Sequence, residues 1–145
     1  MYPGKILLVD DDQQVLYTAR MVLKSHFETV RTESSPSQIR DWLAKEHYDV
    51  VLLDMNFAPG ATSGREGLEW LKVIRELAPE AGVVMNTAYG EINLAVLAMK
   101  EGATDFLVKP WDKERLLATI TSVYQLGQAK KEVQRLKSTQ RVLNR

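Results

Sequence analysis

Short apolar runs alternate along the chain with stretches in which apolar residues recur every three or four positions. The runs are residues 5–9, 28–32, 49–53, 82–86 and 105–108. Three of them are nearly continuous in apolar residues, which favours strands buried on both faces of a parallel sheet. Five alternations of strand and helix predict an α/β fold with a doubly wound parallel sheet.

The stretches between the runs predict five helices, each with one apolar face. Asp12 and Asp112 precede the first and fifth helices and are expected to cap them, and Ser35 before Pro36 is the expected cap of the second. The apolar faces consist of Val15, Leu16, Ala19, Val22 and Leu23; Ile39, Trp42 and Leu43; Leu68, Leu71, Ile74 and Leu77; Leu94, Leu97 and Ala98; and Leu116, Leu117 and Ile120.

Polar residues follow the predicted strands at the points where they end. The residues are Asp10 and Asp11 after the first strand, Asp54 after the third, Thr87 after the fourth and Lys109 after the fifth. Ligands of open α/β sheets bind at the carboxyl ends of the strands. Clustered carboxylates repel one another unless a cation neutralises them, and a site of oxygen ligands alone favours Mg²⁺. A carboxylate can also accept a phosphoryl group.

Composition narrows the class of protein. The 145 residues suffice for one domain, and 45% hydrophobic with 26% charged residues is ordinary for a globular protein. No cysteine is present and the two histidines, His26 and His47, are isolated, so any metal is expected to have oxygen ligands. Without an apolar run of 18 residues or a signal peptide, we expect a cytoplasmic protein with no membrane partner.

Four motifs occur at successive strand ends: ILLVDDD, VVLLDMN, MNTAYG and FLVKPW. In this order and spacing they resemble the receiver domain of two-component response regulators, over roughly residues 4–125. The resemblance implies a flavodoxin-like (βα)5 fold with strand order 2-1-3-4-5. It also implies a signalling switch rather than an enzyme, operated by a phosphoryl group that a partner histidine kinase donates.

The resemblance assigns a role to each strand-end residue. Asp54 would be the phosphoacceptor, and Mg²⁺ would be bound by Asp10, Asp11, Asp54 and the backbone carbonyl of Asn56.

The remaining roles concern the switch. Thr87 and Lys109 would contact the phosphoryl group, and Phe106 would change rotamer when Thr87 moves. The Lys109–Pro110 bond would be cis.

The chain departs from the usual receiver pattern in two places. Gly67 lies thirteen residues after Asp54, so the loop 57–66, with Pro59, Gly60 and Gly64, is about five residues longer than usual, an insertion that costs little closure entropy. Asn86 replaces the usual apolar residue before Thr87, and strand alternation predicts that its side chain points away from Thr87.

Residues 126–145 differ from the rest of the chain. Residues 128–145 contain six basic residues and one acidic residue, a net charge of +5, which leaves −5 on the remainder. We expect a helical extension of the fifth helix, either a marginal coiled coil or an amphipathic helix that frays, and a solvated face rather than a nucleic-acid site. The heptad positions are Leu126, Ala129, Val133, Leu136, Gln140 and Leu143.

The motifs look most like receivers of sigma-54-dependent transcriptional activators of the NtrC type. This similarity implies transcription regulation, with DNA bound only through an output domain outside these residues. We expect a homodimer through helices four and five and the C-terminal helix.

Two other functions are weighed against the switch. An aspartyl-phosphate phosphatase would need a general acid near Asp54, and Asn56 occupies the position where that carboxylate would be expected. A receiver-like interaction module without phosphorylation would be expected to have lost at least one of the strand-end residues, and all of them are present.

Overall fold

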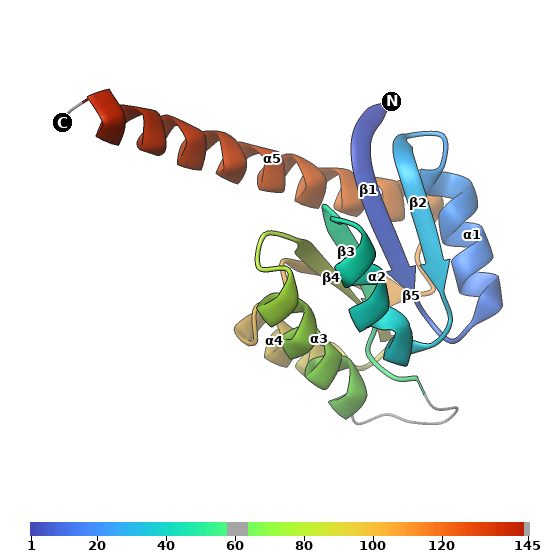
Figure 1. Ribbon diagram of the computed structural model, residues 1–145. Coiled ribbons are helices and arrows are strands. Elements are labelled where there is room, and N and C mark those ends of the chain that lie inside the picture. The colour runs from blue at the N-terminus through green and yellow to red at the C-terminus, as the bar shows by residue number, and fades with distance from the viewer. Residues whose placement is uncertain (58–63, 144–145) are drawn as a thin grey trace.

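Five parallel strands form one sheet in the order β2-β1-β3-β4-β5 (Figure 1). The strands are β1 (Tyr2–Val9), β2 (Phe27–Glu33), β3 (Val50–Asp54), β4 (Gly82–Ala88) and β5 (Asp105–Lys109). This computed structural model describes residues 1–57 and 64–143. Most of the long loop, including Pro59 and Gly60, and the last two residues lie outside these ranges. The predicted fold and strand order are confirmed.

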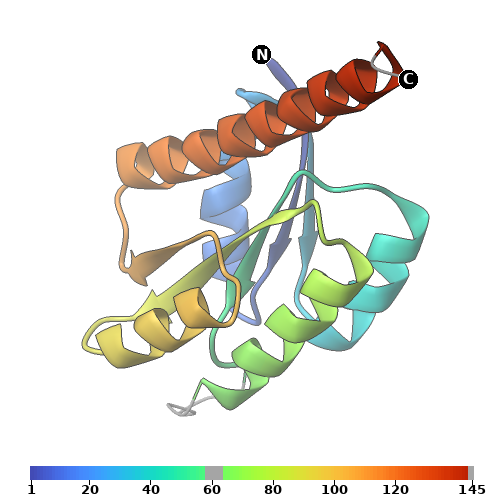
Figure 2. The same cartoon turned by 90° about the vertical axis from the view of Figure 1, so that its left-hand side faces the viewer.

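The helices cover both faces of the sheet (Figures 1 and 2). Their bounds are α1 (Gln13–Leu23), a short 3-10 turn η1 (Pro36–Gln38), α2 (Ile39–Lys45), α3 (Arg65–Leu77), α4 (Ile92–Lys100) and α5 (Lys113–Leu143). The helices α1 and α5 pack on one face, and α2, α3 and α4 pack on the other. None of the helices in the described ranges has the length and apolar character needed to span a bilayer.

Strand alternation divides the core into two layers. On the α1 and α5 face the sheet contributes Ile6, Leu8, Val50, Leu52, Val84 and Leu107. On the opposite face it contributes Leu7, Val9, Val51, Leu53, Val83 and Met85. The strand β3 is buried at every position, as its continuous apolar run predicted. The prediction that Leu77 and Leu97 belong to the core is wrong, since these side chains are 49% and 41% exposed. The buried faces of α3 and α4 are narrower than the periodicity of apolar residues suggested.

The caps of α1 and α5 are formed by the predicted aspartates. The side chain of Asp12 accepts hydrogen bonds from the backbone of Gln14 and Val15, and Asp112 accepts one from Arg115 at 2.7 Å. Ser35 lies at the predicted position before Pro36, but its hydroxyl pairs with the hydroxyl of Ser37 instead of capping the turn. The cap of α1 matters for function because it fixes the chain directly after β1.

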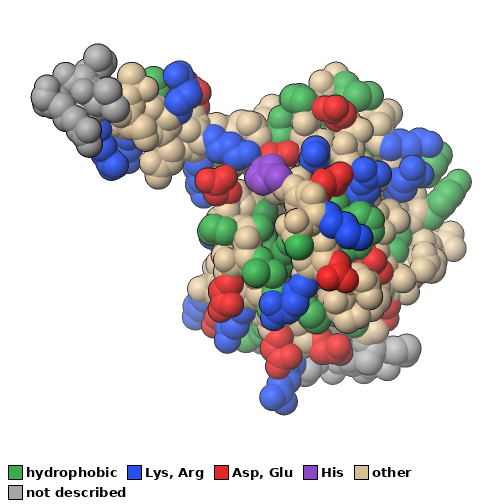
Figure 3. Space-filling model, in the orientation of Figure 1, with side chains coloured by type: hydrophobic (Ala, Val, Ile, Leu, Met, Phe, Trp, Pro, Cys, Tyr) green, Lys and Arg blue, Asp and Glu red, His purple; other side chains and the backbone are tan. Residues whose placement is uncertain are grey.

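The helix α5 is 31 residues long and continues beyond the sheet, and Figure 3 shows this extension projecting from the body of the molecule. Three large apolar residues of the predicted heptad are exposed, Leu126 by 44%, Val133 by 50% and Leu136 by 53%. The division into residues 1–125 and 126–145 stays a prediction. An apolar stripe on a projecting helix is the feature that a helical partner would cover.

Candidate functional site

Carboxylates from two central strands lie side by side at the carboxyl edge of the sheet. Asp54 ends β3, two residues after the core residue Leu52, so its side chain points toward the face that carries α1 and α5. Asp10 follows β1, two residues after Leu8, which pairs with Leu52 in register. Asp10 and Asp54 are only 3% and 5% exposed.

Lys109 joins the two carboxylates. It ends β5, and its Nζ lies 2.9 Å from Oδ2 of Asp10 and 3.3 Å from Oδ1 of Asp54. Burial works against the charged ammonium, but the two carboxylates outweigh it and raise the pKa of Lys109. The lysine is therefore held as a cation between two buried acids.

Burial also controls the protonation of the acids. Burial, together with the charge of Asp10, raises the pKa of Asp54 to about 7, against the opposing effect of Lys109. Burial likewise raises the pKa of Asp10, although the backbone N–H of Asp12 and Lys109 lower it. A cation bound between these groups would remove the repulsion and favour the ionised, nucleophilic form of Asp54.

Asp11 completes an acidic cluster that suits a hard cation. Single carboxylate oxygens of Asp10, Asp11 and Asp54 lie within 4.8 Å of one another, with Asp11 exposed and the other two buried. The backbone N–H of Asp12 donates to Oδ1 of Asp10 at 2.9 Å and orients it. Oxygen donors at this separation, open to solvent on one side, fit Mg²⁺, which keeps several of its waters. No residue of the set offers a nitrogen or sulfur ligand.

Hydrogen bonds of Asn56 and Met55 hold the chain after Asp54. The side-chain oxygen of Asn56 accepts the backbone N–H of Gly64 at 2.8 Å, and its amide donates to Glu91 at 3.4 Å. Gly67 donates to the carbonyl of Met55, and a Cβ at Gly67 would lie 2.6 Å from the backbone of Met55. Glycine is required there because α3 approaches the end of β3 so closely. Asn56 is fixed beside the cluster, and its carbonyl stays a predicted metal ligand.

Comparison with known proteins decides the family. The model of the response regulator receiver domain matches residues 6–121. The chain belongs to this family. It is 33% identical to the response regulator protein PilR of Pseudomonas aeruginosa over 84% of this chain and 31% identical to the DNA-binding transcriptional regulator NtrC of Escherichia coli over 92% of it. The predicted similarity to NtrC-like regulators is confirmed. The receiver spans 26% and 28% of these relatives, about a quarter of their length.

Solved structures agree with this assignment. The N-terminal signal receiver domain of a Bacteroides fragilis response regulator is 45% identical, with a TM-score of 0.75 over 83% of this chain and 96% of that chain. NtrX from Brucella abortus is 28% identical, with a TM-score of 0.84 over 94% of this chain and 29% of that chain. The fold of the receiver is therefore the family fold.

Neither of the two predicted switch residues of the receiver makes a hydrogen bond to the carboxylates within the described residues. Thr87 is 1% exposed, and its hydroxyl donates to the backbone carbonyl of Leu107 at 3.5 Å. Phe106 is partly buried against the cluster under α2, α3 and α4. The cis bond between Lys109 and Pro110 is present as predicted. The roles of Thr87 and Phe106 stay predictions.

The pairing of Asn86 with Asp54 was not predicted from the sequence. Asn86 faces away from Thr87, as strand alternation predicted, but that direction places it beside Asp54, its register partner on β3. The side chain is 1% exposed, and both of its amide atoms are without a partner among the residues that the structure describes. The signal in the sequence was an amide in an otherwise apolar strand.

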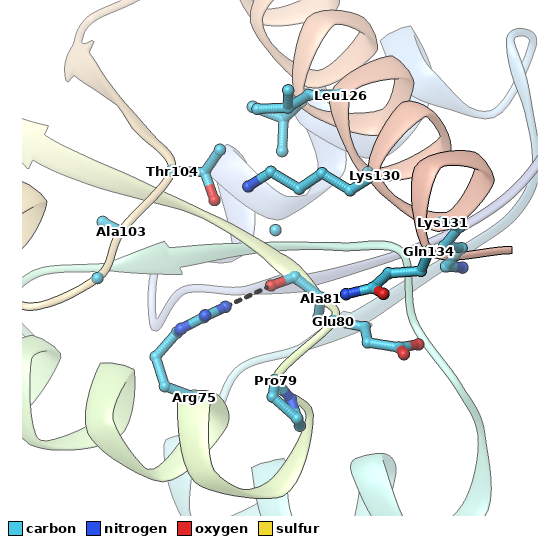
Figure 4. Close-up of a pocket in the computed structure, with 14 residues that line it drawn as sticks. Arg75, Pro79, Glu80, Ala81, Ala103, Thr104, Leu126, Lys130, Lys131 and Gln134 are labelled. Carbon is cyan, nitrogen blue, oxygen red and sulfur yellow. Dashed lines mark hydrogen bonds between the residues drawn. The ribbon is translucent and has the colours of Figure 1, made fainter. Parts of the chain in front are cut away.

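A separate hollow of about 570 Å³ lies at the opposite end of the sheet. It is bounded by the starts of β4 and β5 and by α5, and Figure 4 shows Arg75, Lys130 and Gln134 around it, with Arg75 donating to the carbonyl of Ala81. None of the predicted site residues lines it. The predicted site residues therefore lie at the carboxyl edge of the sheet, away from this hollow.

Proposed function

We propose that this receiver is a switch that accepts a phosphoryl group on Asp54 from a histidine kinase. The observation that carries the proposal is the position of Asp54, which ends the buried central strand 3.3 Å from the ammonium of Lys109 and next to Asp10. A carboxylate oxygen of Asp54 forms a bond to phosphorus while the bond from phosphorus to the kinase histidine nitrogen breaks. The imidazole of the kinase histidine is the leaving group, so the kinase supplies the phosphoryl group.

The charges around Asp54 support this transfer. Receiver domains bind Mg²⁺ at an acidic pocket, and here Asp10, Asp11, Asp54 and the carbonyl of Asn56 would hold it. Bound magnesium supplies positive charge that offsets the charge on the phosphoryl oxygens. Lys109, already held as a cation between Asp10 and Asp54, then pairs with the phosphoryl oxygens.

A signal requires two states that bind the phosphoryl group differently. In this structure the Thr87 hydroxyl is bound to Leu107, one residue from Phe106, and not to the site. Turning that hydroxyl toward the phosphoryl group would free the Leu107 carbonyl and change the packing of Phe106. The adjacent helix α4 exposes the apolar residues Ile92 and Val96, and a second copy of the chain would bind this surface differently in the two states.

Regulation of transcription is a further part of this proposal, and it requires an attached output domain. The regulators that the chain resembles, such as NtrC, are about four times longer than the matched region. The receiver would act on transcription through an attached output domain, to which the α5 extension would lead.

Intact-mass measurement after incubation with Mg²⁺ and acetyl phosphate tests the central claim. We expect one added phosphoryl group on the wild-type chain and none on Asp54→Asn. Asp112→Asn, which removes a carboxylate at the exposed start of α5, is the matched control and should label like the wild type. An unlabelled wild-type chain, or an adduct that persists in Asp54→Asn, would refute the proposal.

A further inference from the structure

Asn86 on β4 is the strand partner of the proposed phosphoacceptor Asp54. Its Cα pairs with that of Asp54 in the parallel register of β3 and β4. Neighbouring strands are about 4.8 Å apart, so side chains of paired residues on one face are in reach of each other. Both side chains continue the core face that Leu52 and Val84 form directly below them.

Packing does not explain an amide at this position. A buried amide without a hydrogen bond costs free energy, whereas an apolar side chain of the same size costs none. In the described part of the chain both Nδ2 and Oδ1 of Asn86 are without a partner. The indole Nε1 of Trp111, which packs against the same core cluster, is another of the six buried side-chain atoms in this condition among the described residues. Unsatisfied polar groups of this kind concentrate at functional sites.

The proposed transfer creates the missing partner. Before transfer, Oδ1 of Asp54 is 3.3 Å from the ammonium of Lys109. During transfer one carboxyl oxygen of Asp54 bonds to phosphorus, the donor oxygen leaves as acetate or the donor nitrogen as imidazole, and Lys109 turns to the phosphoryl oxygens. The other carboxyl oxygen of Asp54 then loses its lysine contact, and because a carboxylate oxygen has two acceptor sites it can accept a hydrogen bond as well as bind a cation.

We propose that the side-chain amide of Asn86 donates a hydrogen bond to this second carboxyl oxygen of Asp54 during and after phosphoryl transfer. The inference rests on the proposed function and adds a residue to it. A hydrogen bond that is absent before the reaction and forms on the way to the product lowers the barrier to transfer. Asn86 thereby positions the acyl group of the phosphorylated receiver. Its amide is unpaired before the reaction, which lowers the stability of the unphosphorylated chain.

The replacement Asn86→Leu separates this role from packing. Leucine has the same number and branching of side-chain heavy atoms as asparagine and carries no polar atom, so the melting temperature should equal or exceed that of the wild type. Labelling by acetyl phosphate with Mg²⁺, followed by intact mass over time, should slow by about three- to tenfold, the effect of one neutral hydrogen bond. A role in packing alone would not slow labelling in a chain of unchanged stability.

Val84→Ala is the matched control, because Val84 lies two residues earlier on the same strand and face. It should lower the melting temperature and leave the labelling rate within about twofold of the wild type. Asn86→Val is measured in the same way as a second apolar variant.

The outcomes separate the two proposals. If the wild-type chain labels and Asn86→Leu labels equally fast, the role of Asn86 is overturned while the phosphoacceptor stands. If the wild-type chain takes no label, the proposed function fails and this inference fails with it. Loss of folding in both apolar variants would also overturn it, because the amide would then be a packing requirement.

Discussion

Lys131 of α5 lies 3.2 Å from Oδ1 of Asp49, the residue directly before β3. Gln128, one turn earlier on α5, donates to the same oxygen, and the backbone N–H of Lys5 donates to Oδ2 at 2.8 Å. Burial opposes the charged form of Asp49, but the bonds from Lys5 and Lys131 outweigh it and lower the pKa of this carboxyl. Asp49 therefore fixes the start of the α5 extension to the amino-terminal edge of the sheet.

Asp49→Ala should release that extension from the sheet. We expect a loss of about 1–2 kcal/mol in the free energy of unfolding, because the carboxylate accepts several hydrogen bonds in a largely buried position. Amide hydrogen exchange, followed by mass spectrometry of peptides from residues 128–143, should become faster.

The control for Asp49 is Glu132→Ala, which removes the exposed pair of Glu132 with Arg135 on the same helix. The two side chains pair within one helix, so the contact of the extension with Asp49 is kept, and exchange of residues 128–143 should change less than in Asp49→Ala. Equal exchange of the extension in Asp49→Ala and in the wild type would show that Asp49 does not hold it.

Gly67→Ala should disturb the chain directly after Asp54. The added Cβ would meet the backbone of Met55 at 2.6 Å, and backbone cannot move aside as a flexible side chain can. We expect a loss of about 1–3 kcal/mol and slower labelling by acetyl phosphate, because α3 must shift away from the end of β3.

Gly127→Ala is the control for Gly67→Ala, because an added Cβ is expected to fit at this position. Gly127 lies inside α5, and a Cβ there meets nothing within 4 Å. Alanine should stabilise the helix by up to about 1 kcal/mol and leave labelling unchanged. A Gly67→Ala variant as stable as the wild type would mean that the approach of α3 to Met55 is not required.

The pattern of hydrophobic residues was sufficient to predict the fold, because it shows which faces of the strands and helices are buried. The runs around Leu8, Leu52 and Val84 became central strands, and Asp12 and Asp112 became caps, since each property depends on neighbours in sequence. Amphipathic faces were predicted too broadly, because periodicity does not tell how much of a helix the sheet covers. Leu97 is the clearest example.

The site was only partly predictable for a related reason. The sequence predicted that Asp10, Asp54 and Lys109 lie together, because parallel strands align their carboxyl ends at one edge of the sheet, and the structure has them in contact. The pairing of Asp54 with Asn86 depends on register between strands, which no local pattern specifies. The anchoring of α5 by Asp49 joins residues about 80 positions apart, and a lone aspartate before a strand gave no sign of it.

The pH dependence of stability should differ between the wild-type chain and Asp54→Asn in the absence of magnesium. The folded chain holds a proton on Asp54 up to about pH 7, whereas the unfolded chain loses it near the ordinary pKa of 3.8. Folding therefore binds a proton in this window, and the contribution of Asp54 to stability falls as pH rises from about 4 to about 7.

Urea unfolding at pH 5 and pH 8, with a chelator present, measures this effect. Relative to Asp54→Asn, the wild type should lose about 2 kcal/mol between the two pH values. Adding Mg²⁺ at pH 8 should restore much of the loss in the wild type and less in the variant. A difference that stays constant with pH would show that Asp54 ionises normally in the folded chain.

Shortening the long loop should leave the chemistry intact. Asn56 and Gly64 are joined by a 2.8 Å hydrogen bond, so the chain already returns beside the site at Gly64. Removal of about five residues within 58–63 changes the closure entropy by only a few tenths of a kcal/mol. Acetyl phosphate labelling should continue at the wild-type rate, and transfer from a cognate kinase should change. Lost labelling would show that the loop helps to build the site.

Phosphorylation should strengthen self-association through α4 and the extension of α5. Val133 and Leu136 are about half exposed on the extension, and Ile92 and Val96 are similarly exposed on α4, so two apolar surfaces are open to a second copy. Sedimentation velocity with beryllofluoride, which mimics the phosphoryl group, should show a larger dimer fraction than without it. Leu136→Glu should reduce that fraction, whereas Gln134→Glu, which adds the same charge beside the hollow of Figure 4, should have a smaller effect. An identical mass distribution with and without beryllofluoride would contradict a switch that acts through dimerisation.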